Sequence, residues 1–152
     1  STTIGKDNSY YCSILNNLAL VYQDMKEYGK AEEMLTDALK SSRTLENSAM
    51  DVAITYSNLG ALYLEMGDYI RAEEDLRESV DIYEQLDTNH QVHLASVYNS
   101  LGILYYKQGK LEEAKEAYQQ ALELTLYHYG KNHEYEILCR NIAAIEEAVR
   151  NA

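Results

Sequence analysis

An internal repeat with a period of 41 to 42 residues constrains this sequence more than any other feature. Three segments align without internal gaps: NLALVYQDMKEYGKAEEML from Asn17, NLGALYLEMGDYIRAEEDL from Asn58 and SLGILYYKQGKLEEAKEAY from Ser100. A partial fourth copy, NIAAIEEAVR, begins at Asn141. Such a chain is expected to fold as a stack of similar units, because each short unit needs a neighbour to bury its apolar flank.

The aligned columns place residues of matching size at helical spacing. In the first half of each unit a small residue follows a leucine or its counterpart, and a tyrosine stands three positions later. The second half carries an alanine, a large side chain four positions later and a small one after three more. This pattern predicts two antiparallel helices per unit, in which small residues allow close approach of backbones. The columns are Leu18, Leu59, Leu101; Ala19, Gly60, Gly102; Tyr22, Tyr63, Tyr105; Ala31, Ala72, Ala114; Leu35, Leu76, Tyr118; Ala38, Ser79, Ala121; and Leu39, Val80, Leu122.

The composition favours an all-α protein, because the chain has no Pro, only seven Gly and frequent helix-forming residues. We expect a single domain with three full repeats, near 8–48, 49–90 and 91–132, and a capping helix over 133–150. The seven predicted helices lie near 8–25, 28–43, 49–66, 69–87, 91–108, 111–127 and 133–150.

Short polar segments are interpreted as the connectors between units. IGKDN at residues 4–8 is similar to YGKNH at residues 129–133, and TNHQ at residues 88–91 has the composition of a capping box. Turns inside the units are predicted at Gly67 and Gly109, whereas the first unit has Lys26 at this place. Residues 1–8 are therefore interpreted as the tail of a preceding repeat. With no initiator Met, we expect a fragment of a longer array.

The repeat resembles the tetratricopeptide repeat (TPR), whose usual unit has 34 residues with this order of Leu, small, Tyr and Ala positions. Its longer period, the NNLA segment at residues 16–19 and the Gly-Lys-Asx-His connector are more similar to the kinesin light chain type. The sequence departs from that type in having Gln91 and Glu134 where Pro usually follows His. Its large aromatic column also holds Leu15, Tyr56, Tyr98 and Cys139. The resemblance implies a right-handed superhelical solenoid whose first helices line a concave face.

Charge and hydropathy exclude several classes of partner. Thirteen Lys and Arg against 25 Asp and Glu give a formal net charge of −12, which repels nucleic acid and anionic membrane surfaces. No apolar run of about 18 residues is present, and the first residues lack the features of a secretion signal. Two cysteines are too few for a disulfide scaffold, which favours a reducing compartment and a cytoplasmic location.

Residues with catalytic or metal-binding chemistry are few. His90 and His93 form an H-x-x-H pair, but no Cys or carboxylate set completes a tetrahedral zinc shell. Cys139 lies six residues after His133, and its thiol is interpreted as a packing group rather than a nucleophile. Paired glutamates recur in register on the second helices, which indicates a solvated face. The pairs are Glu32 and Glu33, Glu73 and Glu74, and Glu112 and Glu113. We expect no cofactor, no metal site and no catalytic site.

Amide and apolar side chains are predicted to line the concave face. Asn can donate to and accept from an extended peptide backbone, and apolar neighbours add contact area. The resemblance implies that Asn17, Asn58 and Asn141 contact the main chain of a bound peptide. Alternatively, these amides are solvated or bond to neighbouring units. The candidate groove residues are Asn16, Asn17, Leu20, Gln23, Asn58, Ala61, Leu64, Asn99, Ile103, Tyr106, Lys107, Arg140 and Asn141.

These features lead to three functional hypotheses. The first is a non-catalytic scaffold that binds a partner peptide or helix, or another segment of its parent protein. The second is a peptide-sensing regulatory domain of a larger bacterial signalling or effector protein. The third, an enzyme using His90 and His93, has the least support. Ile145 and Val149 on the last helix are expected to form an exposed flank through which the chain could self-associate.

Overall fold

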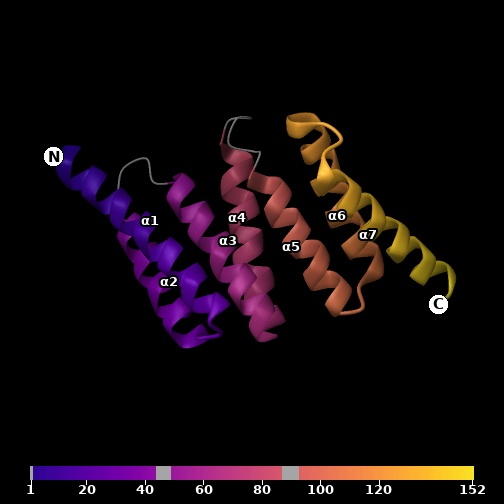
Figure 1. Cartoon of the computed structure of the whole chain (residues 1–152), viewed down its shortest axis with the longest axis horizontal. Coiled ribbons are helices and arrows are strands. Elements are labelled where there is room, and N and C mark those ends of the chain that lie inside the picture. The colour runs from indigo at the N-terminus through magenta and orange to yellow at the C-terminus, as the bar shows by residue number, and fades with distance from the viewer. Residues whose placement is uncertain (1, 44–48, 87–92) are drawn as a thin grey trace. The chain divides into compact units, whose positions relative to one another are not determined.

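The computed structural model describes residues 2–43, 49–86 and 93–152, with side chains from Tyr10 onward. These ranges contain seven α-helices and no strand, which confirms the predicted all-α class (Figure 1). The helices are α1 (Thr2–Asp24), α2 (Tyr28–Arg43), α3 (Ala49–Met66), α4 (Tyr69–Gln85), α5 (Leu94–Lys107), α6 (Leu111–Tyr129) and α7 (His133–Arg150).

The chain divides into two compact units, which are described separately. The N-terminal unit comprises residues 1–82 and contains α1 to α3 with most of α4. The C-terminal unit comprises residues 83–152 and contains the end of α4 with α5 to α7. In the first, α1 packs on α2 and on α3; in the second, α6 packs on α5 and on α7.

Most helix bounds follow the prediction, but the start of the first helix does not. α1 begins at Thr2, so residues 4–8 are helical and their interpretation as a connector is wrong. The similar segment at residues 129–133 does leave the helix, because Gly130 has a φ of 76° and Asn132 accepts a hydrogen bond from the Tyr135 backbone N–H at 2.9 Å. A Gly within a helix costs only about 1 kcal/mol, so the Gly at position 5 can remain helical. Sequence similarity between the two segments therefore does not ensure the same turn. The expected capping box at residues 88–91 lies outside the described residues.

Each turn within a repeat repeats one hydrogen-bond arrangement. Backbone N–H groups of Glu27, Asp68 and Lys110 donate to the carbonyl oxygens of the column tyrosines, Tyr22, Tyr63 and Tyr105, at 2.8, 2.9 and 2.8 Å. The preceding residue has positive φ each time: Lys26 at 62°, Gly67 at 82° and Gly109 at 78°. The first turn therefore reaches the same geometry without Gly, at the cost of left-handed backbone at a lysine.

The interiors of the helix pairs depend on residue size at the predicted small positions. Ala31, Ala72 and Ala114 are fully buried. A Cβ atom at Gly60 would lie 2.5 Å from Leu76 Cγ, and one at Gly102 would lie 2.7 Å from the ring of Tyr118. These distances are well inside van der Waals contact, so the two glycines set how closely their helices approach.

Asp75 on α4 is the one residue of its column that is not apolar: the corresponding positions hold Met34 and Ala117. Burial raises the pKa of its carboxyl group from 3.8 to about 6, with smaller contributions from the nearby carboxylates of Glu74 and Glu78. The folded chain thus binds this proton more tightly than the unfolded chain does. Ionisation of Asp75 therefore opposes folding above its ordinary pKa.

Replacing Asp75 with Asn is expected to stabilise the protein at pH 7.5 and to change little at pH 4. The destabilisation from Asp75 grows as pH rises from about 4 to about 6 and is complete above that range. A pKa raised by about two corresponds to a free energy of about 2.7 kcal/mol, which solvent screening of this half-buried group reduces to about 1 kcal/mol. Urea unfolding at both pH values measures the change in the free energy of unfolding. Glu33→Gln, at an exposed position on α2, is the control. An Asp75→Asn gain that is equal at the two pH values would contradict this explanation.

Candidate functional site

The seam between α1 and α3 is closed by a network of buried polar side chains. Asn16 is 7% exposed, and its Nδ2 donates to the Cys12 carbonyl oxygen at 3.0 Å and to Thr55 Oγ1 at 3.1 Å. Its Oδ1 accepts a hydrogen bond from Asn58 Nδ2 at 2.8 Å. Thr55 Oγ1 in turn donates to the Asp51 carbonyl oxygen at 2.8 Å. Asn16 therefore joins the first helices of two successive repeats.

A second polar cluster closes the other end of the same seam. Gln23 Nε2 on α1 donates to Glu65 Oε2 on α3 at 2.6 Å, and the Tyr28 hydroxyl donates to Glu65 Oε1 at 3.4 Å. A carboxylate acceptor makes such bonds stronger than neutral ones. Several amide and carboxylate groups at the α1–α3 seam are thus hydrogen-bonded to each other.

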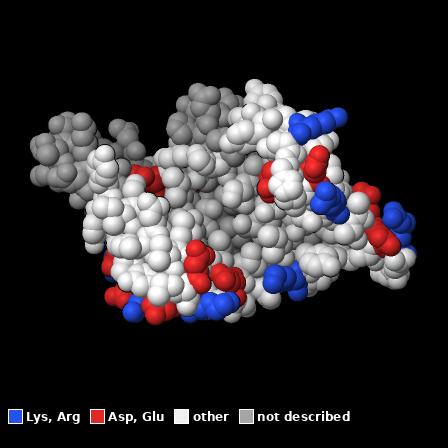
Figure 2. Space-filling model, viewed as in Figure 1, with Lys and Arg blue, Asp and Glu red and all other residues white. Residues whose placement is uncertain are grey.

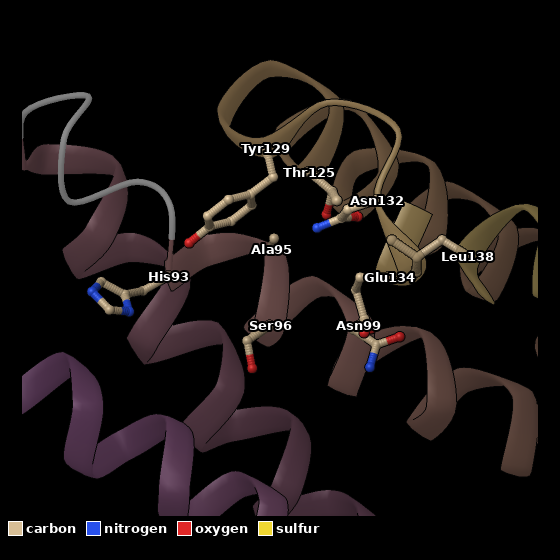
Figure 3. Close-up of a pocket in the computed structure, with 9 residues that line it drawn as sticks. All are labelled: His93, Ala95, Ser96, Asn99, Thr125, Tyr129, Asn132, Glu134 and Leu138. Carbon is tan, nitrogen blue, oxygen red and sulfur yellow. The ribbon is translucent and has the colours of Figure 1, made fainter. Parts of the chain in front are cut away.

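The corresponding seam between α5 and α7 contains a cavity of about 370 Å³ (Figure 3). Asn99 occupies the position of Asn16, and in the described part of the chain its side-chain amide has no hydrogen-bond partner. Two substitutions distinguish the surroundings of Asn99 from those of Asn16. Leu138 stands at the position of Thr55 and removes the hydroxyl acceptor, while Ala95 stands at the position of Cys12 and removes volume. The rest of the wall is formed by His93, Ser96, Thr125, Tyr129, Asn132 and Glu134.

A smaller cavity of about 210 Å³ lies farther along α5 and α7. Tyr106 from α5, Tyr118 from α6 and Asn141 from α7 line it, together with Ala144 and Ile145. Tyr106 is 53% exposed, so its ring is open to a ligand. Residues of both α5 and α7 thus line two cavities in the C-terminal unit. We call this surface the α5–α7 groove.

The predicted groove residues differ in accessibility. Asn16 and Leu64 are buried, and Asn58 and Gln23 are partly buried and bonded within the N-terminal unit. Asn99, Tyr106 and Asn141 line the cavities of the α5–α7 groove. Exposed or partly exposed positions also include Asn17, Leu20, Ala61, Ile103, Lys107 and Arg140.

The prediction of groove residues omitted Thr125, Tyr129 and Asn132, which lie at the end of α6 and in the connector that follows. It considered only first helices, whereas Thr125, Tyr129 and Asn132 also line the cavity (Figure 3). A signal was present, because Ser42 at the position of Thr125 is also small and polar. The prediction that Ile145 belongs to an exposed apolar flank is wrong, since this side chain is only 1% exposed.

The Cys12 thiol does not have the surroundings of a nucleophile. Cys12 is 1% exposed, its Sγ donates to the Ala38 carbonyl oxygen at 3.5 Å, and burial raises the pKa of the thiol. Cys139 is half-buried and neighbours the Tyr135 side chain. Among the described residues, no three His, Cys, Asp or Glu side chains are placed to hold a metal ion. His90 lies outside that set.

Charged side chains occupy limited parts of the visible surface. On the face shown in Figure 2, Lys, Arg, Asp and Glu stand in small separate groups, and most of the described surface between them carries no formal charge. Lys107 and Arg140 supply exposed positive charge on α5 and α7. None of the helices, over the residues described, combines the length and apolar character that crossing a bilayer requires.

Solved structures with the same arrangement of helices include two informative examples. BtubC (BKLC) from P. vanneervenii is 27% identical with a TM-score of 0.79, over 91% of this chain and 56% of that chain. The first TPR of Spaghetti (RPAP3), bound to the HSP90 peptide SRMEEVD, is 20% identical with a TM-score of 0.71, over 93% of this chain and 95% of that chain. The second likeness shows the fold alone.

Sequence comparisons identify the repeat directly. The tetratricopeptide repeat family matches residues 51–126, and a second match to the same repeat covers residues 12–48. The tetratricopeptide repeat protein 19 homolog, mitochondrial, of Drosophila melanogaster is 32% identical over 63 residues, which are 41% of this chain and 17% of that protein. This chain thus spans less than a fifth of that relative and little more than half of BtubC. The repeats, their helix pairs and both family matches agree, and the chain belongs to the tetratricopeptide repeat family.

Proposed function

We propose that the chain is a non-catalytic interaction module that binds a peptide or helix of a partner protein in the α5–α7 groove. The observation that carries this proposal is the difference between the two seams. The α1–α3 seam joins its amides to each other, whereas Asn99 and Asn141 face cavities. Amide groups beside apolar surface suit an extended backbone, which needs both donors and acceptors.

The wider fold supports a peptide ligand. The RPAP3 domain, which has the same fold, holds an HSP90 peptide. Charge argues against an acidic ligand of that kind here, because the whole chain carries a net charge of −12 and only two of the candidate groove residues, Lys107 and Arg140, are cationic. A neutral or basic segment of a partner, or of the parent protein, fits this surface better.

The N-terminal unit offers a separate surface for association. Ile14, Leu18 and Val21 on α1 are 52%, 40% and 53% exposed, whereas their counterparts Thr55, Leu59 and Leu62 on α3 are almost fully buried. We propose that this stripe associates with the same stripe of a second copy, because its spacing of three and four residues is that of a helix-pairing seam. Sedimentation equilibrium tests this; a Val21→Glu variant that self-associates as strongly as the parent chain would disprove it.

A random peptide library selected against the purified chain tests the main proposal. The affinity of recovered peptides is then measured by fluorescence polarisation. Tyr106→Ala combined with Asn141→Ala is expected to weaken binding at least about tenfold, because it removes contact area and a hydrogen-bonding group. Tyr127→Ala with Gln120→Ala on α6 is the matched control, since it makes similar truncations outside the groove. Loss of binding in the control but not in the groove variant would place the ligand on another surface.

A further inference from the structure

The larger cavity of the α5–α7 groove has the chemistry of a site for a particular side chain. This inference rests on the proposed peptide-binding function and names what part of the peptide enters the cavity. The polar groups on its wall include the hydroxyls of Ser96, Thr125 and Tyr129 and the amide of Asn99. Each of these groups can accept a hydrogen bond. The wall therefore suits a ligand with several donors.

Thr125 places a further hydroxyl group on the cavity wall. Its side chain is only 2% exposed. In the other unit the counterpart, Ser42, donates to the Leu39 carbonyl oxygen at 3.0 Å. A donor that enters the cavity can hydrogen-bond to the oxygen of the Thr125 hydroxyl.

Glu134 is the one carboxylate among the described residues that line the cavity. It belongs to the first turn of α7, and no Lys or Arg in the described part of the chain forms an ion pair with it. Figure 3 shows its side chain together with that of Asn99 among the residues that line the cavity. This carboxylate favours a cation, in agreement with the negative charge of the whole chain.

We propose that the cavity receives an arginine side chain of the bound peptide, with Glu134 as its counter-charge. A guanidinium group offers five N–H donors in one plane and stacks readily on aromatic rings, whereas a lysine ammonium is a compact and strongly hydrated charge. Tyr129 and His93 provide rings at the cavity edge, where His93 already stacks with Tyr83 at 5.8 Å between centroids. Ala95 and Leu138 provide apolar wall for the methylene groups.

Titration of the ¹⁵N-labelled full chain with Nα-acetyl-arginine amide tests the proposal. Saturable shifts are expected for the side-chain amide signals of Asn99 and Asn132. The citrulline analogue, which has the same shape without the charge, is expected to bind about tenfold more weakly. Glu134→Gln should weaken arginine binding by a similar factor. Glu136→Gln, two residues farther along α7 and exposed, should leave it unchanged.

Three outcomes would overturn the proposal: equal binding of arginine and citrulline, no effect of Glu134→Gln, or shifts confined to residues outside the cavity. The proposed function can fail separately. If library peptides bind in the α5–α7 groove without arginine and are insensitive to Glu134→Gln, the arginine site is wrong and the peptide groove stands. If the arginine derivative binds as described but groove variants do not affect any selected peptide, the site stands and the peptide groove is wrong.

Discussion

Replacing Gly60 with Ala is expected to lower the free energy of unfolding by about 1–3 kcal/mol. The added Cβ would meet Leu76 Cγ at 2.5 Å and Leu76 Cδ2 at 2.7 Å, and Leu76 is fully buried. Alanine normally improves a helix interior by about 0.5–1 kcal/mol relative to glycine, so a loss here shows that contact outweighs helix propensity. Urea unfolding followed by far-UV circular dichroism measures the difference.

Gly29→Ala is the matched control for this prediction. Gly29 lies in α2, and no atom outside its immediate neighbours would come within 4 Å of an added methyl group, so the same substitution should be neutral or slightly stabilising. Gly102→Ala should behave like Gly60→Ala, because its Cβ would meet the Tyr118 ring at 2.7 Å. If Gly60→Ala and Gly29→Ala stabilise the chain equally, the close approach of α3 and α4 is not as described.

Replacing Asn16 with Ala is expected to destabilise the chain by about 2–4 kcal/mol. The change removes three side-chain hydrogen bonds, to the Cys12 carbonyl, to Thr55 and from Asn58, in a buried setting. The Cys12 carbonyl, Thr55 and Asn58 would lose Asn16 as a hydrogen-bond partner. Leaving a buried polar group without a partner costs more free energy than an ordinary hydrogen bond contributes. Thermal and urea unfolding both measure the effect.

Asn17→Ala is the control, because Asn17 is the next residue on α1 and is exposed. Its effect on the free energy of unfolding should stay within about 0.5 kcal/mol. Asn99→Ala is informative in the same experiment. Asn99 holds the equivalent position but has no partner among the described residues, so this substitution should cost much less than Asn16→Ala. Equal losses at Asn16 and Asn99 would show that the two seams do not differ.

The fold could be predicted closely because the same pattern of large and small residues occurs in three successive repeats. The second helices α2 and α4, for example, share an alanine column, with Ala31 in one and Ala72 in the other, where only a small side chain fits. The start of α1 could not be predicted, because residues 4–8 are similar in sequence to the connector at residues 129–133 but are helical. Whether a Gly leaves a helix depends on the backbone conformation that its surroundings favour, and Gly130 has positive φ beside a capping Asn.

The site was predicted only in outline. Three of the predicted residues, Asn99, Tyr106 and Asn141, line cavities of the C-terminal unit. Spacing alone does not distinguish Asn16 from Asn99, because the difference comes from residues on the facing helix, Thr55 in one repeat and Leu138 in the other. A comparison of columns across facing helices, rather than along one helix, would have separated the closed seam from the open one.

Mapping a library-selected peptide on the ¹⁵N-labelled chain tests the central claim most directly. Backbone and side-chain shifts are expected to concentrate at Asn99, Ile103, Tyr106 and Asn141, while the signals of Asn16 and Asn58 change little. A peptide that instead shifts the signals of Asn16 and Asn58, or those of the second helix α2, would contradict the assignment of binding to the α5–α7 groove.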